Sequence, residues 1–135
     1  MNELDAAIYS QLGGTAVTNL LAGTASIYSW QAPDDASYPY IVFNDMSDIQ
    51  SNMTAHAVHE VVYQVRAFAR TTMKDAKAID NQIRLRLHNT ALSITNFTKL
   101  KGVRESAIRF VENLPNGEIE YSAGALYRFV IERTA

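Results

Sequence analysis

The stretch Tyr38-Pro39-Tyr40-Ile41-Val42-Phe43-Asn44 is apolar on both faces of the strand that it predicts. Alternate residues of a strand point to opposite sides of a sheet, so Tyr40 and Val42 face one side and the intervening Ile41 faces the other. Pro39 lacks a backbone donor and therefore fits the start of a strand or an edge. Because such a strand needs cover on both faces, we expect helices on one face and, in part, neighbouring copies of the chain on the other.

The sequence after this stretch predicts a second strand and a helix. Residues 59–70 predict a half-buried strand with Val61, Tyr63, Val65 and Ala67 on one face and Val62, Gln64, Arg66 and Phe68 on the other. Thr71 or Thr72 is placed to cap a helix over residues 73–88. The apolar stripe of that helix, at spacings of three or four, is Met73, Ala76, Ile79, Ile83 and Leu87.

The remaining patterns complete the element order. Helices are predicted over residues 2–12 and 15–21, and strands over 27–30, 103–114 and 123–134. Pro115-Asn116-Gly117 predicts a turn between the last two strands, which Glu118–Gly124 either extend or leave as a protruding loop. Residues 45–58 show neither period and predict a polar loop. The fold class is therefore α+β, an antiparallel sheet of about four to five strands with an N-terminal helix and one main amphipathic helix packed on one face.

Composition limits the classes of function. The length of 135 residues fits one domain, residues 1–135, with its own core. The absence of cysteine excludes disulfides and thiolate chemistry, and no apolar run approaches the roughly 18 residues that span a bilayer. Residues 1–65 contain seven acidic and no basic residues, whereas residues 66–135 contain all 12 Lys and Arg with the other seven acidic residues. The charges either mix within one domain or form two oppositely charged surfaces that suit head-to-tail self-association.

No residue pattern indicates a catalytic, cofactor or metal site. A G-x-S-x-G elbow and a phosphate-binding loop are both missing from the sequence. His56 and His59 stand near acidic residues, but they do not supply the three or four fixed ligands of a metal site, so exposed histidines are the simpler interpretation. The basic residues of the second half suggest nucleic acid, yet the sequence pI of about 5.9 argues against a dedicated binder.

Several residues are candidates for a subunit contact instead. Asp45, Asp48, Ile49 and Met53 lie in the predicted loop, where long connections are often functional. The side chain of Tyr40 belongs either to the core or to an interface. Arg66 and Arg84 fit a solvated face or a subunit contact.

Together these residues resemble the small tail-completion, or tail-terminator, proteins of long-tailed bacteriophages. The resemblance spans nearly the whole chain and lies in the order of the elements and in a few runs of sequence. These runs are Gly23-Thr24-Ala25-Ser26-Ile27-Tyr28, Ala36-Ser37-Tyr38-Pro39-Tyr40-Ile41-Val42-Phe43, Tyr63-Gln64-Val65-Arg66-Ala67-Phe68-Ala69 and Tyr127-Arg128-Phe129-Val130-Ile131.

The resemblance implies a structural virion protein that is not an enzyme and needs no cofactor. In that family the subunits form a homohexameric ring that caps the head-proximal end of the tail tube, ends tube polymerisation and offers the head-joining surface. The expected partners are further copies of the chain, the tail tube protein and the head connector or stopper protein. DNA passes through the lumen without specific binding, and no membrane is involved. The expected location is the virion, after assembly in the host cytoplasm.

Two other classes remain open from the residues. One is a different neck component of the particle, such as a head–tail adaptor, with the same fold class. The other is a small cytoplasmic α+β ligand-binding domain or enzyme, which requires a pocket with converging polar groups.

Overall fold

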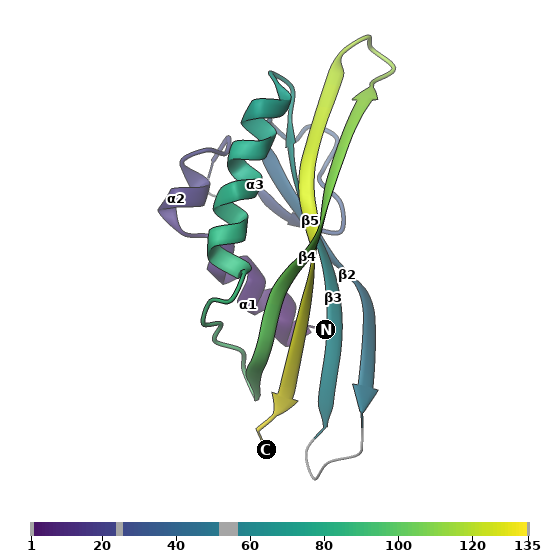
Figure 1. Ribbon diagram of the computed structural model, residues 1–135. Coiled ribbons are helices and arrows are strands. Elements are labelled where there is room, and N and C mark those ends of the chain that lie inside the picture. Colours follow the sequence, from purple (N-terminus) through teal and green to yellow (C-terminus); the bar gives the residue numbers. More distant parts are fainter. Residues whose placement is uncertain (1, 24–25, 52–56, 135) are drawn as a thin grey trace.

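Within residues 2–23, 26–51 and 57–134, the parts of the chain that the computed structural model describes, five strands form one sheet in the order β1-β2-β3-β5-β4. The elements are α1 (Asn2–Leu12), α2 (Thr15–Thr18), β1 (Ile27–Ser29), β2 (Tyr40–Ser51), β3 (Val58–Ala69), α3 (Met73–Leu87), β4 (Phe97–Asn113) and β5 (Ile119–Arg133). The helices all lie on one face of the sheet (Figure 1). Only the short β1 pairs in parallel, with β2, and the other neighbours are antiparallel. The predicted α+β fold class is confirmed.

The core lies between the sheet and the helices, as the alternation in β3 predicts. Val61, Tyr63 and Val65 are fully buried against the helices, and the intervening residues are only half-buried. From β5, Tyr127 and Phe129 continue the same layer. The apolar residues of these two central strands therefore define which face the helices cover.

The helix α3 follows its predicted stripe. Its N-cap is Thr72, whose side chain accepts a hydrogen bond from the backbone N–H of Asp75 at 3.2 Å. The buried residues of the helix are Ala76, Ile79, Asp80, Ile83 and Leu87. The helix ends at Leu87, its C-cap is His88, and the next residue, Asn89, adopts a positive φ of 53°. The helix α1 also has its predicted bounds, whereas α2 is shorter than predicted and Gly14 is its N-cap.

The prediction of a loop over residues 45–58 is wrong for residues 45–51 and for Val58, whereas residues 52–56 lie outside the described part of the chain. The strand β2 continues to Ser51 and β3 begins at Val58, so the two strands form a long hairpin that reaches beyond α1 (Figure 1). The six residues from Met46 to Ser51 are exposed, which removes the apolar alternation that marks a half-buried strand. A register shift between Asp45 and Ser47 further interrupts the period of two.

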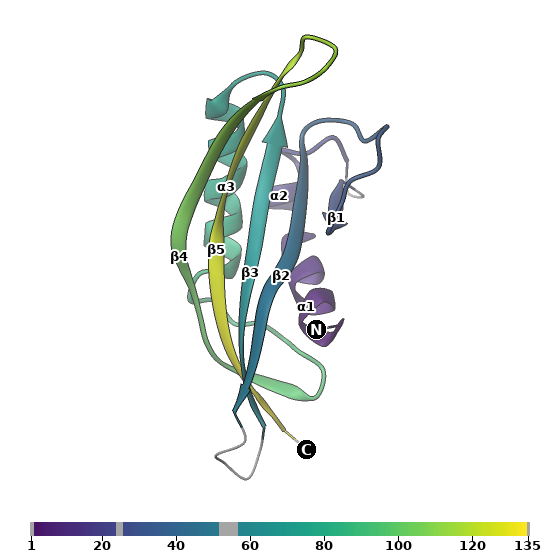
Figure 2. The same cartoon turned by 90° about the vertical axis from the view of Figure 1, so that its right-hand side faces the viewer.

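The strands β4 and β5 form a second long hairpin that extends past β3 and α3 at the opposite end of the sheet (Figures 1 and 2). The predicted turn joins them: the N–H of Gly117 donates to the carbonyl of Leu114 at 3.0 Å, and Gly117 has a φ of 84°. A side chain is strained at that positive φ, and glycine is not. Residues Ile119–Gly124 therefore extend the hairpin, and both strands begin earlier than predicted.

Candidate functional site

The sheet face that points away from the helices is the main candidate surface. Figure 2 shows this face with the helices behind it. Along β3 and β5 it presents half-buried residues of mixed character, among them Val62, Gln64, Leu126, Arg128 and Val130. Among the described residues, no helix packs on this face. A broad face that is partly apolar and has no helix cover is the type of surface that binds another protein chain.

Part of this face is covered by the chain itself. Tyr40 and Val42 of β2 and Phe68 of β3 form a small second core. The segment before β2 packs on it: the ring of Tyr38 stacks on that of Tyr40 with centroids 4.8 Å apart. The expectation that neighbouring copies cover the second face of this strand is therefore corrected at Tyr40 and Val42, where the cover comes from Tyr28, Ala32, Ala36 and Tyr38.

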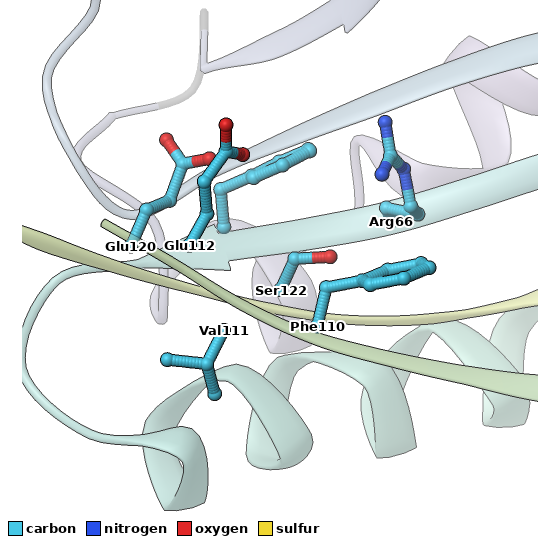
Figure 3. A pocket seen from close by; sticks show the side chains of 7 residues that line it. Arg66, Phe110, Val111, Glu112, Glu120 and Ser122 are labelled. Atoms are coloured by element: carbon cyan, nitrogen blue, oxygen red, sulfur yellow. The ribbon is translucent and has the colours of Figure 1, made fainter. Parts of the chain in front are cut away.

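Beside this second core the sheet carries a shallow hollow of about 280 Å³ (Figure 3). We call it the acidic hollow, and it is lined by Arg66, Phe68, Phe110, Val111, Glu112, Glu120 and Ser122. Glu112 and Glu120 are directly paired across β4 and β5, so their carboxylates lie side by side. The guanidinium of Arg66 lies apart from them, 4.9 Å from the centre of the Phe68 ring.

The polar groups of the acidic hollow are unequally satisfied. Glu120 is buried and accepts a hydrogen bond from the hydroxyl of Tyr38. Burial and this bond to a carboxylate both raise the pKa of Tyr38. Ser122 is only 3% exposed, and its Oγ has no hydrogen-bond partner within the described part of the chain. A buried hydroxyl without a partner is unusual in a folded protein.

An internal ion cluster connects the helix layer to the strand that forms one wall of the acidic hollow. Asp80 of α3 is 2% exposed, and Arg104 of β4 donates to both of its carboxylate oxygens at 3.0 and 2.9 Å. Arg109 reaches the same carboxylate at 3.2 Å and also donates to the carbonyl of Gly124 at 3.1 Å. The two arginines neutralise Asp80 and hold β4 against α3, which fixes the base of the projecting hairpin.

The β2–β3 hairpin carries three of the residues predicted as contacts. The register shift places Asp45 opposite Tyr63 and Asp48 opposite Val61, so both aspartates lie on the helix-side face although they are three residues apart. Asp48 contacts His59 at 2.8 Å. Ile49 lies on the uncovered face and is 62% exposed. Met53 and His56 fall outside the described residues.

The structure separates the other predicted residues. Arg66 lines the acidic hollow, whereas Arg84 lies on the solvent side of α3, where it contacts Asn81 at 3.0 Å. Tyr40 lies inside the second core. The predicted residues thus belong to four regions and do not form one site. Sequence analysis missed Glu112, Glu120 and Ser122. The one sequence signal for a site here was that Phe110 and Val111 are adjacent apolar residues of a predicted strand, so one of them faces each side of the sheet.

The described residues contain neither a group of metal ligands nor a membrane-spanning helix. No group of three or more His, Cys, Asp or Glu side chains in residues 2–23, 26–51 and 57–134 is close enough to hold a metal ion. None of the described helices has the length and apolar character needed to cross a membrane.

Comparisons with known proteins point to one family. The sequence pattern of the family described as tail completion protein gp17 matches residues 6–114. A chain in the solved structure titled "Virion of native gene transfer agent (GTA) particle" has a similar fold, with a TM-score of 0.69 and 18% sequence identity. The match covers 97% of this chain and 96% of that chain. No curated protein matches by sequence.

Proposed function

Since the chain belongs to the family of tail completion proteins gp17, we propose that it forms the ring that caps the head-proximal end of a phage tail tube. Membership of this family makes it a structural virion protein of the tail or neck. In the proposed role the ring ends tube polymerisation and provides the surface to which the head is joined. Its partners are further copies of the chain, as a hexamer, together with the tail tube protein and the head connector or stopper protein.

The family match over residues 6–114 carries this proposal, because it includes all elements from the later part of α1 to the β4–β5 turn. We propose that residues 1–135 act as one tail-terminator-like domain and that the protein is not an enzyme. It is made in the host cytoplasm and is then incorporated into the virion. The partly apolar uncovered face supports self-association, since a ring needs a surface of each subunit that meets a different surface of the next.

We place Asp45 and Asp48, with Ile49 and Met53, at the lumen or at a neighbouring subunit. The support for this placement is that residues 46–51 of β2 are exposed and that the described parts of β2 and β3 reach beyond α1 (Figure 1). Carboxylates at the lumen repel phosphate and so avoid the counterion-release binding that would retain DNA. A particle with Asp45→Lys and Asp48→Lys is therefore expected to assemble but to eject DNA more slowly. Unchanged assembly and ejection would contradict this placement.

The decisive experiment removes the gene from its parent replicon and inspects the particles by electron microscopy. Tail termination predicts tails of abnormal length beside finished heads, and a plasmid copy of the wild-type gene restores normal particles. Tails of normal length that remain unjoined to heads would instead favour a head–tail adaptor. Normal, infectious particles would refute the structural role in the particle.

A further inference from the structure

We propose that the acidic hollow of one copy receives the solvent face of α3 from a second copy of the chain. This inference rests on the proposed ring and names the two surfaces that form its subunit contact. Each copy offers both surfaces, because Glu112 and Glu120 project from one side of the β4–β5 hairpin (Figure 3) and α3 lies on the other side of the sheet (Figure 1). They cannot meet within one copy, so the contact is head-to-tail and repeats until the ring closes.

The acidic hollow is built for a basic side chain. Glu112 is exposed and has no ion-pair partner within the described residues, and Glu120 lies directly opposite it. Like charges opposite each other on two strands destabilise the pair unless a cation lies between them. Phe110, which is 58% exposed, supplies an apolar wall for the stem of a long side chain.

The solvent face of α3 has the matching chemistry. We call it the basic stripe, and its exposed residues at helical spacing are Lys74, Lys77, Ala78, Asn81, Arg84 and Leu85. Lys74 and Lys77 have no ion-pair partner among the described residues, and Asp80 of the same helix is buried and already paired with Arg104. Lys74 and Lys77 therefore lack an ion pair in one copy, and the one exposed acidic residue of this helix, Asp75, accepts a hydrogen bond from Thr71.

Apolar groups accompany the charges on both surfaces. Leu85 is 52% exposed on the basic stripe, and Phe110 is 58% exposed at the acidic hollow. A contact that buries these apolar groups and pairs the charges combines hydrophobic gain with specificity.

Strand pairing between the free sheet edges is a weaker alternative. The outer strand β4 has register shifts between Lys99 and Lys101 and between Arg104 and Ser106. Bulges and charged side chains on an edge oppose the addition of a further strand. The faces of the sheet, rather than its β4 edge, are therefore the surfaces for association.

Cysteine cross-linking tests the contact in assembled particles, because the natural chain contains no cysteine. We expect Lys77→Cys combined with Glu112→Cys to give a ladder of cross-linked species up to the closed ring when a short bis-maleimide is added. Each single cysteine variant is the matched control and gives no ladder if the contact is head-to-tail. A ladder from a single variant, or none from the double variant in particles that contain the protein, would overturn the proposal.

Charge reversal provides an independent measurement. Glu112→Lys or Lys77→Glu alone is expected to reduce the yield of joined particles by on the order of ten-fold or more, because like charges then meet at the contact. The double reversal is expected to restore most of that yield. Glu132→Lys, at the other end of the same face, and Lys101→Glu, on the β4 edge, are controls without effect. If the double reversal is as defective as the single variants, the contact is overturned but the ring is not. Absence of the wild-type protein from particles would refute the proposed function itself.

Discussion

Replacement of Asp80 by asparagine tests how strongly the buried ion cluster stabilises the fold. The carboxylate is 2% exposed, and the side chains of its partners Arg104 and Arg109 are 15% and 34% exposed. Asp80→Asn leaves two guanidinium groups without a counter-charge at the interface of α3 with β4. Loss of one partner of a buried pair costs about 3–5 kcal/mol. We expect about 2–4 kcal/mol here, because Arg109 is partly solvated and the amide still accepts one hydrogen bond.

Urea unfolding followed by far-UV circular dichroism measures this cost directly. A lower midpoint with an unchanged m-value indicates a pure loss of stability. For a chain of 135 residues, each kcal/mol lowers the melting temperature by about 3–4 °C, so the expected decrease is about 7–14 °C.

The matched control is Glu105→Gln, which removes an exposed carboxylate that Arg128 contacts at 2.9 Å. Exposed pairs contribute about 0–1 kcal/mol. If Asp80→Asn costs less than about 1 kcal/mol and cannot be distinguished from this control, the cluster does not anchor β4. Hydrogen exchange at the amides of the β4–β5 hairpin supplies a second measurement, since a detached hairpin exchanges faster.

Three further predictions concern the fold. Gly124→Ala is expected to cost at least about 1–3 kcal/mol in urea unfolding, because the added Cβ would lie 2.2 Å from a backbone oxygen of β3. Gly23→Ala is its neutral control, because the added Cβ there has no atom within 4 Å apart from its neighbours in the chain. Ile83→Ala is expected to lower the free energy of unfolding by about 2–5 kcal/mol, and the exposed Leu85→Ala by less than about 1 kcal/mol; equal effects would contradict the assigned helix face. Burial raises the pKa of Tyr127 to about 12, so the stability from its protonated phenol is present below the unfolded pKa of about 10 and is lost as the pH rises towards 12. Burial also raises the pKa of Tyr40 and Tyr63, so Tyr127→Phe is expected to reduce the alkaline loss of stability in a titration without abolishing it.

The central strand and helix were predictable because each has one side that is more buried than the other. Val61 and Tyr63 alternate with less buried residues in β3, and the stripe that includes Ile79 and Ile83 marks the inner side of α3. Asn116 and Gly117 marked the turn through their tolerance of unusual backbone angles. In the strand and the helix, burial repeats at the period of the element, and the turn depends on two adjacent residues. A short window of sequence therefore reveals each of them.

The rest depends on partners that are distant in the sequence. The part of β2 after Asp45 is solvated on both faces, so its strand conformation comes from pairing with β3 and leaves no apolar period. The acidic hollow combines Arg66, Glu112 and Ser122 from different strands, and only the register of β3, β5 and β4 brings them together. The cover of Tyr40 by the preceding segment likewise needs a three-dimensional path that no periodicity encodes.

The sheet order has a consequence for how fast the chain folds. The strands β2 and β3 follow each other in the chain, as do β4 and β5, so each hairpin closes a short loop. The pairing of β3 with β5 joins segments separated by α3 and β4, and closing that larger loop costs more entropy before contacts compensate for it. We therefore expect the docking of two preformed hairpins to limit the rate. Substitutions along the β3–β5 pair would then slow refolding, whereas substitutions at the hairpin tips would mainly accelerate unfolding.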